Sequence, residues 1–221
     1  LLVRIPAKAR LARPLNLPGA MAEMDLVRHL RGMAGRNASA EDYACFLGAG
    51  SYDHSMPSPI NHLILRGEFF TAYTPYQPEA SQGTLRTIFE YQTMMAELTG
   101  MDVANASIYD GASALAEAAL MSARVTRRTR ICVSAGLHPH WREVLRTYTE
   151  GIGLTLSTLD LDETGRTAIR PLPADTAAVI VQSPNFFGCI EELAAASEAA
   201  HAVGALAIAA TAEALSLALL R

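Results

Sequence analysis

Three polar groups follow segments with the pattern of buried strands, where open α/β sheets bind their ligands. They are the turn Asp110-Gly-Ala-Ser113, His138 in the stretch Ala135–His140, and Glu213. Backbone N–H groups at the turn could hold an anion at a helix N-terminus, and the imidazole could contact a ligand. Each group also has an ordinary interpretation. Asp110 would cap a helix with Gly111 permitting a tight turn, His138 would be a satisfied histidine at the surface or at a helix start, and Glu213 a carboxylate at a helix start.

Lysine is the residue type that decides which chemistry these groups could serve. Catalysis through an imine needs a primary amine on a side chain, and arginine cannot replace it because its guanidinium stays protonated. The only lysine among the 221 residues is Lys8, in a leader rich in proline and arginine. The three groups therefore have no lysine placed to work with them.

Two loops carry a second set of candidates. The segment Tyr73–Glu79 has two tyrosines, two prolines and no periodicity, which predicts an ordered loop because proline restricts the backbone. Aromatic residues of this kind commonly pack at an interface; they could also reach a ligand. Residues Ser51–His54 lie on a second loop and are candidates for the same cleft, although Asp53 and His54 could equally form a local cap.

The elements that must position these residues can be read from periodicity. Helices are predicted over 20–36, from Pro57 or Pro59 to about Gly67, and over 81–98, where Ser81 is the N-cap and Gly100 the stop. Strand and helix signals then alternate. Strands are expected at 103–107, 130–134, 154–159, 177–182 and 205–210, and helices at 112–124, 139–148 and 190–203.

This alternation predicts an α/β fold with a mostly parallel sheet covered on both faces, preceded by a helical N-terminal arm. We expect residues 1–100 to form the arm and its interface helices, and residues 101–221 to form the sheet domain.

The run 202–220 is nearly all apolar and close to membrane-spanning length. Glu213 and Gly204 interrupt it, and long apolar runs also mark covered strands, so we expect a buried strand, a turn and the start of another element rather than a membrane span. The sequence begins without methionine and stops inside this run. We therefore expect a fragment that is truncated at the C-terminus.

Composition excludes several classes of protein. A formal charge of −4 and a pI near 5.9 argue against a nucleic-acid partner, which would require a basic face. Cys45, Cys132 and Cys189 have no metal-type spacing and predict reduced, mostly buried thiols in a cytoplasmic protein. The basic run 124–130 most simply complements a helix dipole in solvent, and an acidic docking partner is an alternative.

Several long blocks carry a family resemblance. They are Phe46–His54, Tyr73–Glu79, Ser81–Gly83, Tyr91–Thr93, Leu98–Ser107 and Pro184–Gly188. With these blocks the sequence resembles the alpha-chain (subunit 1) type of the P-protein family of the glycine cleavage system. The resemblance implies the aspartate aminotransferase-like fold of pyridoxal-phosphate enzymes, fold type I. It also implies a complex that decarboxylates glycine and transfers the aminomethyl group to the lipoylated H-protein.

The resemblance further implies how the candidate residues divide their roles. Gly111 and Ser113 correspond to the phosphate turn of the cofactor site, His138 to the residue that stacks on the ring, and Glu213 to the partner of the ring nitrogen. Glu213 followed by Ala214 departs from the Asp-Gly turn of active chains, so this site resembles a degenerate copy. The beta subunit is then expected to hold pyridoxal phosphate and supply the lysine, and this chain is expected to hold no catalytic residue of its own.

In such a fold the active site lies at a subunit interface, which gives the loops a role. The resemblance implies that this chain contributes loop residues to the beta subunit's active site: Tyr73, Thr74, Tyr76, Gln77, Glu79 and His54. Two alternatives stay open. The chain could be the first half of a single-chain P-protein, or a structural interaction subunit with a decayed cofactor fold and no part in catalysis.

Overall fold

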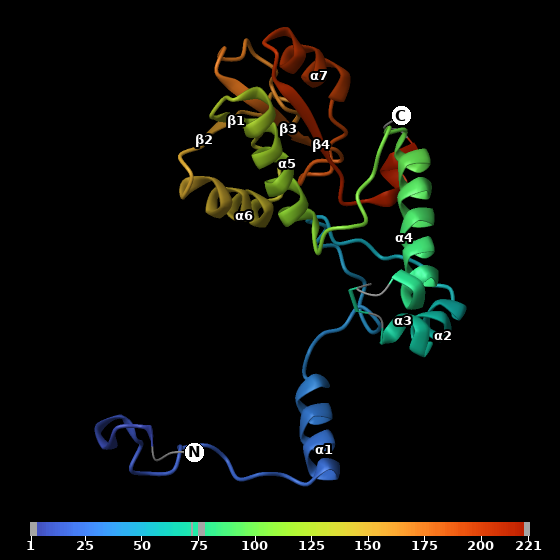
Figure 1. Ribbon diagram of the computed structural model, residues 1–221, viewed down its shortest axis with the longest axis vertical. Coiled ribbons are helices and arrows are strands. Elements are labelled where there is room, and N and C mark those ends of the chain that lie inside the picture. The colour runs from blue at the N-terminus through green and yellow to red at the C-terminus, as the bar shows by residue number, and fades with distance from the viewer. Residues whose placement is uncertain (1–3, 72, 75–77, 219–221) are drawn as a thin grey trace. The chain divides into compact units, whose positions relative to one another are not determined.

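The computed structural model describes residues 4–71, 73–74 and 78–218, without the side chains of 78–81 (Figure 1). The chain divides into two compact units, Leu1–Phe46 and Leu47–Arg221. The boundary expected near Met101 falls inside the second unit and stays a prediction.

The first unit contains a short 3-10 helix, η2 (Ala7–Ala9), and one α-helix, α1 (Glu23–Ala34). The helix confirms the prediction from apolar spacing, with narrower bounds. Glu23 and Asp25 lie in its first turn and Arg31 in its last, the arrangement that complements the helix dipole. None of the described residues of this unit is buried, so the unit has no core of its own.

The second unit opens with loops and helices. A loop covers residues 47–55, as expected, and is followed by α2 (Pro59–Ile64), α3 (Gly67–Phe70) and α4 (Pro78–Thr99). The N-cap predicted at Ser81 is wrong, because α4 already begins at Pro78, whose fixed φ suits a first helical turn. Gly100 ends this helix as predicted, with a φ of +71°.

A four-stranded parallel sheet forms the centre of the second unit. Its strands are β1 (Arg130–Ser134), β2 (Thr155–Leu159), β3 (Thr176–Gln182) and β4 (Leu206–Ala210), in the order β2-β1-β3-β4. The accompanying helices are α5 (Gly111–Thr126), α6 (Pro139–Glu150) and α7 (Leu193–Ala202), and a 3-10 helix, η3 (Ala214–Ala218), follows β4. The α/β class and the parallel pairing are as predicted.

Alternate residues of the central strands serve two cores. Ile131 and Val133 of β1 and Ile180 of β3 pack toward α5 and α6, whereas Cys132 and Val179 pack toward α7. This is the period of two expected of a strand covered on both faces. Figure 1 shows α5 and α6 together on one side of the sheet and α7 on the other.

The strand predicted at 103–107 is wrong. The backbone there has no strand partner within the described chain; instead, Gln92 Nε2 donates to Ala104 O at 2.6 Å and Asn105 Oδ1 accepts from Ser107 N at 3.2 Å. Side chains thus satisfy polar backbone groups that a neighbouring strand would otherwise pair. Ser107 also has a φ of +127°, which is incompatible with a strand.

The apolar run 202–220 contains the end of α7, a turn, β4 and η3, as expected. However, β4 is an edge strand that leaves Ala207 and Ala209 exposed, so it is only half covered. None of the helices described here is long and apolar enough to cross a membrane.

The basic run 124–130 is more structured than the sequence predicted. Arg127 ends α5 in the left-handed conformation, with a φ of +56°. Arg128 Nη1 donates to Thr176 O at 2.9 Å and to Val203 O at 2.6 Å. Arg130 pairs with Asp175 at 2.9 Å and lowers the pKa of that carboxyl, mainly through the hydrogen bond between the two side chains. Arg128 and Arg130 therefore join elements instead of only facing solvent.

Candidate functional site

The strand order reverses direction next to β1, and this matters for the carboxyl end of the sheet. From β1 the chain crosses to β2 on one side, and β3 then pairs with β1 on the other side. Such a reversal is the point at which open α/β sheets bind ligands. The segments that leave β1 and β3, residues 135–138 and 183–187, flank this point.

His138 lies at that position and is held by hydrogen bonds at two atoms. Its backbone N–H donates to Gln182 Oε1 at 2.9 Å, and its Nδ1 accepts from the backbone N–H of His140 at 3.2 Å. Because Nδ1 is an acceptor, the neutral ring carries its proton on Nε2. The His138 ring packs edge-on against Phe186, with centroids 5.2 Å apart. The helix-start interpretation is confirmed, since His138 is the N-cap of α6.

A buried polar network under His138 fixes the loop after β3. Asn185 Nδ2 donates to Glu191 Oε1 and to Gly165 O, both at 2.8 Å, and Asn185 Oδ1 accepts from Phe187 N and Cys189 N, both at 3.0 Å. The second oxygen of Glu191 accepts from Thr167 N at 2.8 Å. No buried polar side-chain atom in the described part of the chain lacks a partner, so this network is fully satisfied and rigid.

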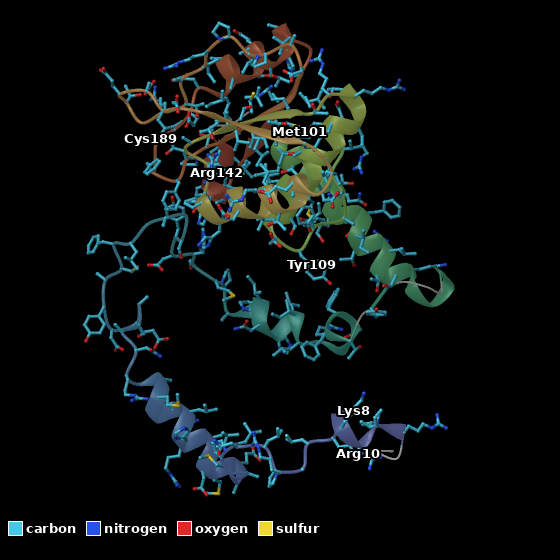
Figure 2. All side chains as sticks on the ribbon, turned by 90° about the vertical axis from the view of Figure 1, so that its left-hand side faces the viewer. Lys8, Arg10, Met101, Tyr109, Arg142 and Cys189 are labelled. Carbon is cyan, nitrogen blue, oxygen red and sulfur yellow. The ribbon has the colours of Figure 1, made fainter. Side chains whose placement is uncertain are left out.

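Gly136 shows how closely the two strand ends approach. A Cβ built on Gly136 would lie 3.0 Å from Asn185 Cβ, which leaves little room for any side chain. Arg142 fastens α6 to the same edge, because its Nη2 donates to Ser134 O and its Nη1 to Thr158 Oγ1 at 3.3 Å. Burial lowers the pKa of the Arg142 guanidinium. Figure 2 shows Arg142 at this edge of the sheet domain.

The turn Asp110–Ser113 is a helix cap. Asp110 Oδ1 accepts from Ser113 N at 2.8 Å and Oδ2 accepts from Ser113 Oγ at 2.9 Å, which confirms the capping interpretation. The hydrogen bond from the Ser113 backbone, and then that from its hydroxyl, lower the pKa of Asp110. Tyr109, the preceding residue, is fully exposed (Figure 2).

Gly111 is glycine because of a neighbouring ring. A Cβ there would lie 2.6 Å from both Cη2 and Cζ2 of Trp141, well inside van der Waals contact. Trp141, from α6, thus lies directly against the first turn of α5. The turn is therefore not open to an anion. The Ser113 N–H group already binds the Asp110 carboxylate, and the Trp141 indole lies against Gly111.

Glu213 faces His54. The carboxylate Oε1 accepts from Leu215 N at 3.0 Å and so caps η3, while Oε2 lies 3.6 Å from His54 Nε2. The glutamate side chain is 14% exposed and that of the histidine 59%. His54 therefore pairs with a residue distant in the sequence instead of its neighbour Asp53.

The tyrosine-bearing loop is described only in part. Tyr73 is 83% exposed and Thr74 is exposed as well. Tyr76 and Gln77 lie outside the described residues, and for Glu79 only the backbone, within α4, is described. Within the second unit the structure brings His54 to Glu213, and Trp141 lies near His138 and against Gly111 of the turn. The role of the tyrosine-bearing loop is left to be proposed.

Other features are less suited to chemistry. No group of three metal-ligating side chains occurs in the part of the chain that the structure describes.

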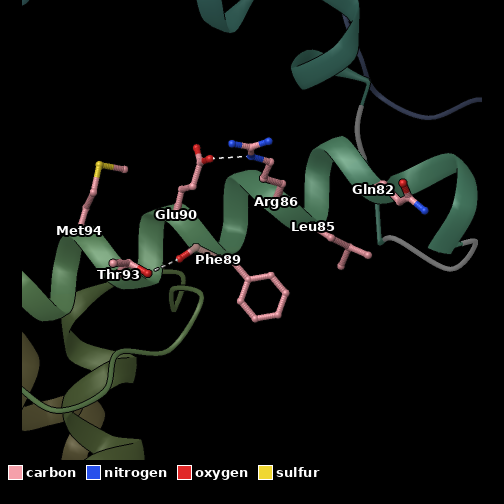
Figure 3. A pocket seen from close by; sticks show the side chains of 7 residues that line it. All are labelled: Gln82, Leu85, Arg86, Phe89, Glu90, Thr93 and Met94. Atoms are coloured by element: carbon pink, nitrogen blue, oxygen red, sulfur yellow. Dashed lines mark hydrogen bonds and ion pairs between the residues drawn. The ribbon is translucent and has the colours of Figure 1, made fainter.

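A hollow of about 670 Å³ follows one face of α4 and is lined by Leu85, Arg86, Phe89, Met94 and others (Figure 3). Arg86 and Glu90 form an ion pair at 2.8 Å on this face. Because residues of a single helix line it, the hollow has no converging polar groups of the kind that ligand sites contain.

Sequence reasoning missed Asn185, Glu191, Thr167, Trp141 and Gly136. The available signal was the segment Pro184–Gly188 directly after a buried strand, since such a position lies at the ligand edge of a parallel sheet. Glu191 and Thr167 gave no signal, because their contact depends on how two loops meet.

The fold and this edge together define a class of protein. The aspartate aminotransferase of Thermotoga maritima shares the fold, with a TM-score of 0.50 and 15% identity over 84% of this chain and 50% of that one. The second unit therefore has the fold of the large domain of pyridoxal-phosphate enzymes of fold type I. Within that class the model of the glycine cleavage system P-protein matches residues 1–221. The chain belongs to this family.

Close relatives agree with this assignment. A probable glycine dehydrogenase (decarboxylating) subunit 1 of Desulforamulus reducens is 53% identical over 92% of this chain and 46% of its own length. A crystal structure of the glycine decarboxylase P-protein in inhibitor-bound form matches with a TM-score of 0.87 and 47% identity, over 98% of this chain and 48% of that one. The chain thus spans about half the length of the relatives it matches.

Proposed function

We propose that this chain acts as the alpha subunit of a glycine cleavage P-protein, without the Schiff-base lysine. With a beta subunit it decarboxylates glycine by means of pyridoxal phosphate, and the aminomethyl group passes to the lipoylated H-protein. The family match over residues 1–221 carries this proposal. The name of the relatives, subunit 1, favours the split form over a single-chain P-protein.

The residues of this chain's own carboxyl edge do not fit a phosphate-bearing cofactor. At the turn after residue 110, the N–H and hydroxyl of Ser113 already bind the Asp110 carboxylate, whose negative charge repels a phosphate. Glu213 is engaged by Leu215 N and His54, and Trp141 lies against Gly111. The only lysine, Lys8, is exposed in η2 of the first unit. The proposal therefore assigns the cofactor and its lysine to the beta subunit.

Loop residues are the proposed contribution of this chain to the reaction. Tyr73, Thr74, Tyr76, Gln77, Glu79 and His54 would approach the beta subunit's active site, where their side chains would shape the cleft and help to exclude water. The exposure of Tyr73 supports this role. Exposed apolar side chains on α4, such as Phe89 at 69% and Met94 at 60%, support a chain that works within an assembly, because isolated soluble proteins rarely present such faces.

We place the complex in the cytoplasm. The cysteines Cys45, Cys132 and Cys189 are all free thiols in the structure, which supports a reducing compartment. The expectation that they are mostly buried is wrong, because Cys45 is exposed and only Cys132 is fully buried.

Borohydride trapping tests where the cofactor binds. The intact subunit is incubated with pyridoxal phosphate, alone and with a beta subunit, then reduced and digested, and the labelled lysine is located by mass spectrometry. We expect the label on the beta chain only, together with CO2 release from glycine on mixing. A stoichiometric label on Lys8 would overturn the assignment of roles, and unchanged CO2 release by a beta subunit alone would leave this chain without a catalytic part.

A further inference from the structure

The loop of residues 47–55 lies beside the carboxyl edge of the sheet. His54 Nε2 lies 3.6 Å from Glu213 Oε2. A Cβ added to Gly50 would lie 3.5 Å from His138 Cδ2, an ordinary van der Waals distance, so the loop also passes near this ring. Glu213 and His138 lie on segments far along the chain, after β4 and after β1.

The loop needs such contacts because no helix or strand hydrogen bonds stabilise its backbone. Gly48, Ala49 and Gly50 are three consecutive residues with φ of +62°, +58° and +78°, a conformation that costs free energy for alanine. Residues 51–57 form neither helix nor strand. The loop's position therefore depends on contacts outside it.

Glu213 is the fixed member of the pair that it forms with His54. Its Oε1 accepts from Leu215 N at 3.0 Å, and its carbonyl oxygen accepts from Ser216 Oγ at 2.6 Å and Thr211 Oγ1 at 3.2 Å. These hydrogen bonds aim Oε2 at His54. The largely exposed His54 is the member that can move.

We propose that Glu213 is a positioning residue: through the contact of its carboxylate with the His54 imidazole it fixes the loop 47–55, and with it the start of the segment that leads through α2 and α3 to Tyr73. Pro57 and Pro59 restrict the backbone between the loop and α2, so a shift of the loop is carried forward. This inference rests on the proposed function, in which the segment that begins at Tyr73 reaches the partner's active site.

The test compares variants of the intact subunit in the reconstituted complex. Glu213→Gln keeps an oxygen that accepts from Leu215 N but removes the carboxylate charge, and His54→Gln removes the imidazole that faces it. We expect each to lower kcat for glycine-dependent CO2 release by roughly ten- to a hundredfold, because a misplacement of about 1 Å far from the chemistry can cost on the order of 10²-fold. The affinity between the subunits stays unchanged.

Hydrogen exchange of the subunit alone gives a readout that does not depend on catalysis. Peptides that cover 47–56 should exchange faster in Glu213→Gln and in His54→Gln. The matched control is Glu150→Gln, which breaks the pair of Arg146 Nε and Glu150 Oε1, also 3.6 Å apart but within one helix. It should change neither readout.

The outcomes separate the two steps of the inference. Unchanged exchange in Glu213→Gln overturns the anchoring of the loop, and faster exchange with unchanged kcat overturns the positioning role. If the wild-type complex does not turn over glycine, the proposed function fails and the positioning role with it. The exchange data would then still decide whether Glu213 anchors the loop.

Discussion

At the scale of residues, Trp141 and Asp110 occupy the places in which a cofactor phosphate would be expected. The indole lies against Gly111, and the carboxylate takes the two donors of Ser113. Because of these contacts the turn has a structural role, and the two donors of Ser113 are not available to a phosphate. Two predictions concern these contacts.

Gly111→Ala tests the contact with Trp141. Alanine would normally stabilise a helical position relative to glycine, but its Cβ would lie 2.6 Å from the indole. We expect the clash to win and to lower the free energy of unfolding by about 1–3 kcal/mol. Urea unfolding measures the change, and fluorescence reports it locally because Trp141 is the only tryptophan. In a Trp141→Leu background the same substitution should be neutral or stabilising; an equal loss there would contradict the explanation.

The Asp110 cap should depend on pH in a defined direction. Its pKa lies below the usual 3.8 because it accepts hydrogen bonds from the Ser113 backbone and hydroxyl. A lowered pKa in the folded state means that the cap stabilises the protein above pH 3.8 and loses this effect as the pH falls through the lowered pKa. An NMR titration of the Asp110 carboxyl should give a midpoint below 3.8. In Ser113→Ala the midpoint should rise toward 3.8, and an unchanged midpoint would count against the role of the hydroxyl.

At the scale of elements, single side chains join helices and strands on both edges of the sheet. On the carboxyl edge Arg142 fastens α6 to the end of β1. On the opposite edge Arg128 bridges the carbonyl groups at the start of β3 and just after α7. These hydrogen bonds hold the helices in place in addition to the packing of the two hydrophobic cores.

Arg128→Met should therefore destabilise the sheet domain. The substitution removes the two hydrogen bonds that the charged guanidinium donates, and it leaves the carbonyl groups of Thr176 and Val203 without this donor. We expect a loss of roughly 1.5–3 kcal/mol in the free energy of unfolding. The control, Arg124→Met in the exposed last turn of α5, should stay within about 0.5 kcal/mol of the wild type. Equal effects in chemical denaturation would show that net charge, and not the bridge, is responsible.

At the scale of the whole molecule, stability is concentrated in part of the chain. Every described buried residue lies between Ala112 and Ser216, and none lies in the first unit. The first unit presents an amphipathic helix, α1, whose exposed apolar residues include Met24 at 76%. This distribution suits an arm that acts in an assembly and a sheet domain that supplies the core.

Deletion of residues 1–46 should consequently leave the thermal unfolding of the second unit unchanged. The deleted residues contribute no buried apolar area of their own, and burial of such area is the main source of stability. Calorimetry of the intact subunit and of the shortened subunit should give Tm values that agree to within a degree or two. A fall of more than about 2–4 °C, which corresponds to roughly 1 kcal/mol in a domain of 150–250 residues, would mean that the arm stabilises the sheet.

The sequence by itself determined the α/β class, four strands and the helices between them, because local periodicity and turn residues encode these features. The strands predicted at 130–134, 154–159, 177–182 and 205–210 agree with the observed bounds to within one residue. It also determined the family, through the blocks around Tyr73 and Pro184, and the absence of a suitably placed lysine. Local patterns failed at 103–107, where an extended, apolar segment forms no strand because side chains satisfy its backbone.

Only the tertiary structure decided which distant residues meet. It brought His54 to Glu213, Trp141 to Gly111, and Asn185 to Glu191. It also placed β4 at an edge, where its apolar residues are half exposed. These contacts depend on how loops and helices pack at the end of the sheet, and packing is a property of the assembled chain that no local sequence window contains.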